Sequence, residues 1–62
     1  MKRKAFIKHL AECGCELLRE GGKYSVYRNP ATGAEAPVTR HPEIADYTVK
    51  KLCKELGVDS PK

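Results

Sequence analysis

Apolar side chains recur at helical spacing in two segments of the chain, about residues 3–13 and 46–56. Within each segment they lie three or four positions apart, so they would form one face of an amphipathic helix. Gly14 and Gly57 follow the two segments and can adopt the left-handed conformation that ends a helix, while Asp46 is the expected N-cap of the second helix. The two apolar faces consist of Phe6, Ile7, Leu10 and Cys13, and of Val49, Leu52, Cys53 and Leu56.

The segment between the predicted helices has the residue types of strands and turns. Gly21 and Gly22 predict a tight hairpin turn with positive φ, and the run Asn-Pro-Ala-Thr-Gly at 29–33 predicts a second turn. Pro37 cannot donate a ladder hydrogen bond, so its strand is expected at a sheet edge or to be irregular. The expected strands cover about residues 15–20, 24–29 and 35–39.

The predicted element order is α-β-β-β-α, which indicates a single α+β domain over residues 1–62. Three antiparallel strands with both helices on one face would bury both apolar helix faces and leave the other sheet face to solvent. A domain of this size buries only about 60% of the surface of its unfolded chain. Such a thin core leaves no room for a deep cofactor pocket, so we expect no cofactor and any chemistry on an open surface.

The chain is basic, with 12 lysines and arginines against 8 acidic residues and a formal net charge of +4. A positive field on so small a surface favours polyanions such as nucleic acids. Excess lysine also keeps small domains soluble, so the charge alone does not distinguish RNA binding from a role unrelated to nucleic acid.

The cysteines and the hydropathy pattern favour a cytoplasmic protein. The three cysteines cannot all pair with one another, and the chain begins without a charged segment followed by an apolar core. Cys13 and Cys15 are too close in sequence for the usual zinc half-site, so we expect apolar packing roles and no metal. No apolar run approaches the ~20 residues that cross a bilayer, so no membrane partner is expected.

Several short stretches of the sequence occur together, in this order, in one known family. They are residues 14–19 (GCELLR), 21–25 (GGKYS), 28–33 (RNPATG), 40–44 (RHPEI) and 47–57 (YTVKKLCKELG). With the first helix they cover nearly the whole chain, which resembles the HicA-type toxins of bacterial toxin–antitoxin pairs. The resemblance implies a fold like that of double-stranded-RNA-binding domains. It also implies an endoribonuclease that cleaves mRNA without a metal and is silenced by a HicB-type antitoxin.

The sequence departs from that family at the position held to be catalytic. The family has a histidine two positions after a glycine that follows the first strand, whereas this chain has Gly22-Lys23-Tyr24. Metal-free RNA cleavage needs a base and an acid, and an imidazole with a pKa of ~6.5 suits both tasks. A phenol, with an ordinary pKa of about 10, can donate a proton at neutral pH but rarely accepts one. Tyr24 could therefore be a catalyst with altered pH dependence, a stacking platform, a disabling replacement, or a cross-strand packing residue.

His41 is the other candidate for proton transfer, because it lies in a loop directly after the third predicted strand. A loop histidine can also be simply solvated. Guanidinium and ammonium groups bind phosphate, and the expected RNA contacts are Arg19, Gly22, Lys23, Arg28 and Arg40. The alternative is that the arginines pair with Glu20 and Glu35 as ordinary strand residues. At the level of function, the alternative is a catalytically inactive RNA-binding or antitoxin-binding module.

Overall fold

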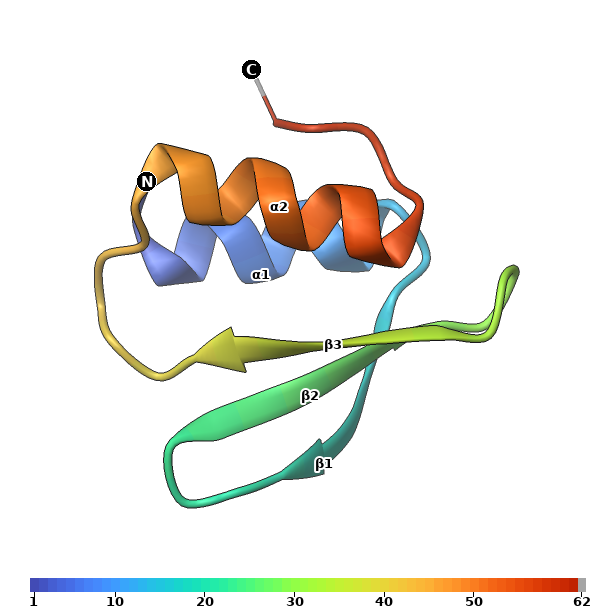
Figure 1. The fold of residues 1–62 in the computed structure, drawn as a ribbon, viewed down its shortest axis with the longest axis horizontal. Coiled ribbons are helices and arrows are strands. Elements are labelled where there is room, and N and C mark those ends of the chain that lie inside the picture. The colour runs from blue at the N-terminus through green and yellow to red at the C-terminus, as the bar shows by residue number, and fades with distance from the viewer. Residues whose placement is uncertain (62) are drawn as a thin grey trace.

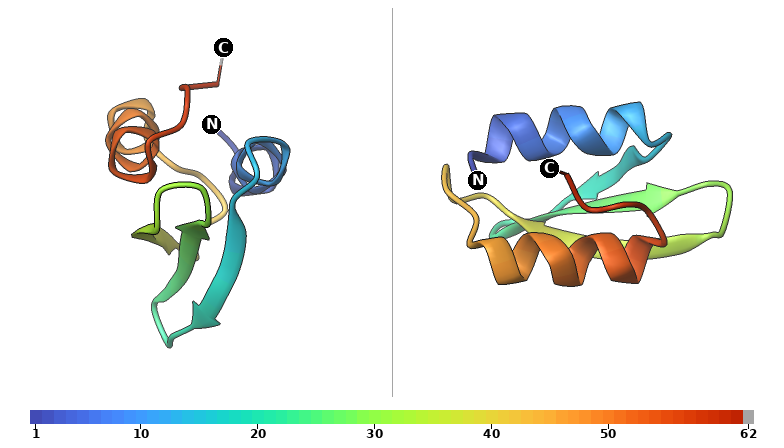
Figure 2. Two further views of the ribbon diagram at one scale, coloured as in Figure 1. Left: turned by 90° about the vertical axis from the view of Figure 1, so that its right-hand side faces the viewer. Right: turned by 90° about the horizontal axis from the view of Figure 1, so that it is seen from above.

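The computed structural model describes residues 1–61, which form two helices and one three-stranded antiparallel sheet. The elements are α1 (Arg3–Glu12), β1 (Glu16–Glu20), β2 (Tyr24–Asn29), β3 (Ala34–Thr39) and α2 (Asp46–Leu56). The strand order is β1-β2-β3, and both helices lie side by side over the same face of the sheet (Figures 1 and 2). The predicted α-β-β-β-α architecture is confirmed. Neither helix within residues 1–61 is long and apolar enough to cross a membrane.

Two of the three predicted helix-end signals, the glycines that follow the two helices, are confirmed. Gly14, just after α1, has φ +86°, and Gly57, the C-cap of α2, has φ +72°, so both glycines adopt the predicted left-handed conformation. The predicted N-cap role of Asp46 is wrong. Ala45 is the N-cap, and Asp46 is the first helical residue, without a side-chain capping bond. The Asp46 carboxylate lies 3.7 Å from the N-terminal ammonium.

The turn between β1 and β2 forms without left-handed residues, so the predicted positive φ of Gly21 and Gly22 is wrong. The last pair of the β1–β2 ladder is Glu20 with Ser25, so residues 21–24 lie between these two paired residues, and Tyr24 is already part of β2. A longer connection does not require the mirror-image turn of a two-residue hairpin. The Gly21 N–H closes it by donating to the Tyr24 carbonyl at 2.7 Å.

Both edges of the sheet have features that limit regular pairing. β3 is an edge strand, as Pro37 predicted, with Pro37 opposite Val26. β1 is the other edge, and its register shifts between Leu17 and Arg19. Strict alternation would place these two residues on the same face, but the bulge brings Arg19 opposite Val26, on the face that no helix covers.

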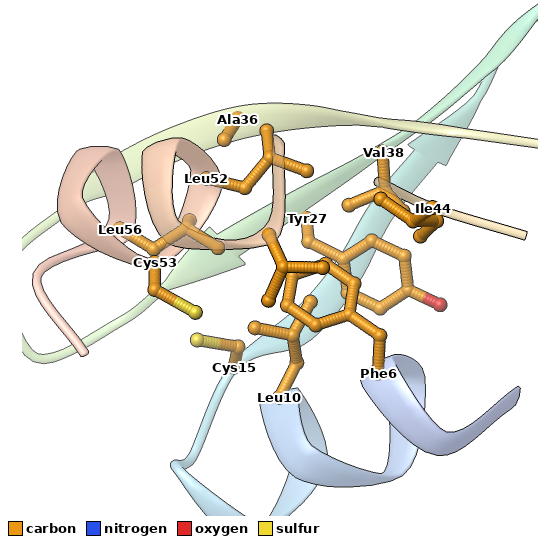
Figure 3. Packing of buried hydrophobic residues seen from close by; sticks show 11 residues of the cluster. Phe6, Leu10, Cys15, Tyr27, Ala36, Val38, Ile44, Leu52, Cys53 and Leu56 are labelled. Atoms are coloured by element: carbon orange, nitrogen blue, oxygen red, sulfur yellow. The ribbon is translucent and has the colours of Figure 1, made fainter. Parts of the chain in front are cut away.

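The core lies between the helices and the covered face of the sheet (Figure 3). Its buried apolar residues are Phe6, Leu10, Cys15, Tyr27, Ala36, Val38, Ile44, Val49, Leu52, Cys53 and Leu56. Burial raises the pKa of the Cys15 and Cys53 thiols, and the nearby thiol of Cys13 adds to the rise. Both core thiols therefore stay protonated and pack as small apolar groups. Residues 1–61 contain no group of histidine, cysteine and acidic side chains arranged to hold a metal ion.

Candidate functional site

Residues of the β1–β2 turn and of the β3–α2 loop line one shallow, open pocket. Both connections lie at the same end of the molecule as the N-terminus (Figure 1). The volume of the pocket is about 460 Å³, and the residues that line it are Lys23, Tyr24, Thr39, Arg40, His41 and Pro42. We call this the end pocket. It brings together four of the residues expected to act on RNA, including both candidates for proton transfer.

Antiparallel pairing explains why Tyr24 and His41 line the same pocket. Tyr24 begins β2 and is opposite Thr39, which ends β3. Opposed residues of a ladder share a face, so Tyr24 and Thr39 both project from the uncovered face. Tyr24 is 50% exposed, and His41 follows Thr39 by two positions on the exposed loop. The phenol and the imidazole are therefore both open to a ligand from solvent.

The loop that carries Arg40 and His41, residues 39–42, is held by hydrogen bonds at both ends; we call it the site loop. At its start, Arg3 Nε donates to the Thr39 carbonyl at 2.9 Å. At its end, the Arg3 backbone N–H donates to the Pro42 carbonyl at 2.8 Å. Within it, the His41 N–H donates to Thr39 Oγ1 at 3.3 Å. These bonds fix the backbone from which the imidazole projects.

An ion pair determines the surroundings of Arg40. Arg40 Nη2 lies 3.0 Å from Glu20 Oε2, so pairing with Glu20, considered above as an alternative to phosphate binding, occurs for Arg40. The other Glu20 oxygen, Oε1, accepts a 3.5 Å hydrogen bond from the fully buried hydroxyl of Ser25. Ser25 in turn accepts a 3.1 Å hydrogen bond from Arg3 Nη2. A continuous polar network thus runs from Arg3 to the guanidinium of Arg40.

Arg19 and Arg28 do not line the end pocket. Arg28 lies in the ladder between Glu16 on β1 and Glu35 on β3, so two acidic residues flank its charge on the uncovered face. Arg19 and Glu35 line a separate shallow depression of about 290 Å³ over β2 and β3. The expected basic residues therefore divide between the end pocket and a charge-balanced sheet surface.

Gly22, also expected at the RNA site, lies in the exposed β1–β2 turn. A Cβ at this position would meet nothing within 4 Å, and φ is not positive. Neither the fold nor the turn therefore requires glycine here.

Arg3 and Ser25 were not among the residues expected at the site, and Glu20 was expected only as an alternative partner of the arginines. One signal was present in the first turn of α1, which holds no acidic residue although acidic side chains are favoured there. Lys2, Arg3 and Lys4 line a second hollow of about 380 Å³, which shares Pro42 with the end pocket. Glu43 and Asp46 lie close by, each 3.7 Å from the N-terminal ammonium. Basic side chains are thus concentrated at this end of the molecule, with acidic side chains close to them.

The chemistry of the end pocket suits an anion that also carries a flat ring. Lys23 and Arg40 provide cationic groups for a phosphate, and the exposed Tyr24 ring provides a stacking surface. The phenol can donate a proton, and a neutral imidazole can accept one.

A family model described as the HicA toxin of bacterial toxin–antitoxin matches residues 3–58 of this chain. The match begins at the first residue of α1, ends just beyond α2, and includes every residue of the end pocket. Neither a curated protein nor a solved structure matches the chain significantly.

Proposed function

Because the chain belongs to the HicA toxin family of bacterial toxin–antitoxin systems, we propose that this toxin binds single-stranded mRNA in the end pocket and cleaves it without a metal. The observation that carries the proposal is that Tyr24 and His41 line one pocket together with Lys23 and Arg40. This set combines a proton donor, a proton acceptor and two phosphate-binding cations. No other pocket described above combines these four groups.

The shape of the end pocket favours an unpaired nucleotide. It is shallow and open, and its single aromatic ring is half-exposed. Bases of a duplex are stacked within the helix, whereas an unpaired base can be splayed out and stacked on an aromatic side chain. The row of Glu16, Arg28 and Glu35 holds two acidic residues and one basic residue, so it offers little attraction to a long run of duplex phosphates.

The proposed reaction is attack of the ribose 2′-oxygen on the adjacent phosphorus. The O2′–P bond forms, the P–O5′ bond breaks, and the products are a 2′,3′-cyclic phosphate and a 5′-hydroxyl. The His41 imidazole would take the proton of the 2′-hydroxyl, and the Tyr24 phenol would donate a proton to the leaving O5′. Arg40 and Lys23 would stabilise the charge that develops on the phosphoryl oxygens.

The family also implies a cognate antitoxin. We propose that a HicB-type antitoxin silences this toxin and that both act in the cytoplasm, where mRNA is found. The three free thiols are compatible with that reducing compartment.

A second candidate function is an RNA-binding or antitoxin-binding module that no longer cleaves. The observation that favours it is Tyr24 itself, because a half-exposed phenol stacks on bases readily but does not replace an imidazole as a base. The two candidates make the same prediction for binding and differ for cleavage.

The test is cleavage of a labelled single-stranded RNA in EDTA by the purified chain and by the Tyr24→Phe, His41→Gln and Tyr24→His variants. We expect the unmodified chain to cleave and both Tyr24→Phe and His41→Gln to lose activity. Cleavage by Tyr24→His alone would establish the non-cleaving module. If neither the unmodified chain nor Tyr24→His cleaves while both are folded, the ribonuclease function is wrong.

A further inference from the structure

Arg3, on the first turn of α1, contacts three different parts of the structure around the end pocket. We infer that Arg3 is a positioning residue, which holds the site loop so that Arg40 and His41 face the substrate. The inference rests on the proposed function, because it concerns the same pocket. It goes beyond that function in assigning a role to a helix residue that does not line the end pocket.

The first step is the clamp on the backbone of the site loop. Arg3 holds the loop at Thr39 through its side chain and at Pro42 through its backbone N–H, at 2.9 and 2.8 Å. Arg40 and His41 are the only residues between these two points, and both are exposed. A short loop tied at both ends to a helix has few conformations open to it.

The second step is the link to the guanidinium of Arg40. Arg3 Nη2 donates to the Ser25 hydroxyl, Ser25 donates to Glu20, and Glu20 pairs with Arg40. Ser25 is fully buried, so its hydroxyl cannot exchange these partners for water. The Glu20 carboxylate is therefore held from one side while it orients Arg40 on the other.

The geometry needs an arginine and not merely a positive charge. One guanidinium donates from Nε to Thr39 and from Nη2 to Ser25, in two fixed directions. A lysine ammonium is a point charge on a flexible stem and cannot reproduce this fork. A positioning role and a direct phosphate contact therefore predict different behaviour for Arg3→Lys.

The experiment compares the full chain with its Arg3→Ala, Arg3→Lys and Lys4→Ala variants. Lys4 is the matched control, because it is the next residue of α1, is exposed, and its side chain forms no hydrogen bond or ion pair within residues 1–61. Amide hydrogen exchange by NMR reports the order of the site loop without requiring cleavage. Steady-state kinetics on a short single-stranded RNA separate kcat from KM.

We expect both Arg3 variants to raise amide exchange at His41 on the order of tenfold, with β2 amides unchanged. We expect kcat to fall about 10- to 100-fold with a smaller change in KM, because small misplacements of catalytic groups have effects of that size. Lys4→Ala should change neither the amide exchange at His41 nor kcat. Ser25→Ala should leave exchange at His41 unchanged, because the bonds from Arg3 to the Thr39 and Pro42 carbonyls remain, and it should still lower kcat.

Unchanged exchange at His41 in Arg3→Ala, or normal kcat and loop order in Arg3→Lys, would overturn the positioning role. Failure of the proposed function looks different: the unmodified chain would not cleave RNA, while the Arg3 variants would still loosen the site loop. If Arg3→Ala does not fold, Arg3→Lys and Ser25→Ala decide the matter by the same two measurements.

Discussion

The carboxylate of Glu20 lies 3.0 Å from the guanidinium of Arg40, so one proposed phosphate ligand is paired with an acidic residue. Both side chains are about half exposed, 54% for Glu20 and 45% for Arg40. An exposed ion pair of this kind is worth about 0–1 kcal/mol, so a phosphate can compete with it.

Neutralising Glu20 should therefore strengthen RNA binding with little effect on stability. Glu20→Gln removes a negative charge beside the end pocket, and we expect RNA affinity to rise while the free energy of unfolding changes by less than about 1 kcal/mol. Fluorescence anisotropy with a short RNA at two salt concentrations measures the effect. Glu55→Gln, on the exposed side of α2, is the control for net charge; an equal rise in this control would show that the location of Glu20 is irrelevant.

Arg40 and Arg28 should differ as RNA contacts although both lie on or beside the sheet. We expect Arg40→Ala to weaken binding about tenfold and to reduce the salt slope by about 0.7, the value for one phosphate contact on a single strand. Arg28→Ala should change little, because Arg28 lies between Glu16 and Glu35. Anisotropy across a salt series compares them. Equal losses in the two variants would place the RNA on the sheet face.

Asn29 should stabilise the fold at the end opposite the pocket. Its Nδ2 donates to the Leu56 carbonyl at 2.7 Å, and its Oδ1 accepts from the Ala31 N–H at 3.1 Å. Asn29→Ala leaves a buried carbonyl without its partner, so we expect a loss of about 1–3 kcal/mol in urea unfolding. Thr32→Ala, which removes an exposed hydroxyl bonded to the Ala34 N–H, should cost less. RNA binding by folded Asn29→Ala should be unchanged.

The core thiols should make stability fall at high pH. Burial raises the pKa of Cys15 and Cys53 above the ordinary value of 9.0. Both thiols are neutral in the folded and the unfolded chain at low pH, so their contribution to the stability of the fold is fully present below pH 9. Above pH 9 the unfolded chain loses these thiol protons before the folded chain does, so stability is lost as the pH rises toward the pKa values of the folded state.

Native alkylation with iodoacetamide at pH 8 should modify Cys13, which is only half-buried, before Cys15 and Cys53, because the two core thiols are buried. Faster labelling of the two core thiols would contradict the buried placement.

The architecture could be predicted from the sequence because each helix and strand has its own local sequence signal. These signals determine only the structure of neighbouring residues. They are the apolar faces of the helices, the glycines at 14 and 57, and Pro37 at a sheet edge. Asp46 shows the limit of such signals, because the helix begins at Asp46 itself and the N-cap is Ala45, a residue without a capping side chain.

The site was harder to predict because it depends on register and on long-range contacts. Arg19 reaches the uncovered face only through the bulge at Leu17 and Arg19, which no composition rule reveals. The sequence identified Lys23, Tyr24, Arg40 and His41 as candidates, but their meeting in one pocket depends on the pairing of Tyr24 with Thr39. Arg3 could not be predicted as a site residue from the sequence, because its hydrogen-bond partners lie far along the chain, on β2 and at the end of β3.

The most direct test of the RNA site is an NMR titration of the folded chain with a short single-stranded RNA. The proposed function predicts that amide shifts concentrate on Lys23, Tyr24, Arg40 and His41 and saturate together. Shifts centred on Arg19 and Arg28, or no saturable shifts at all, would contradict it.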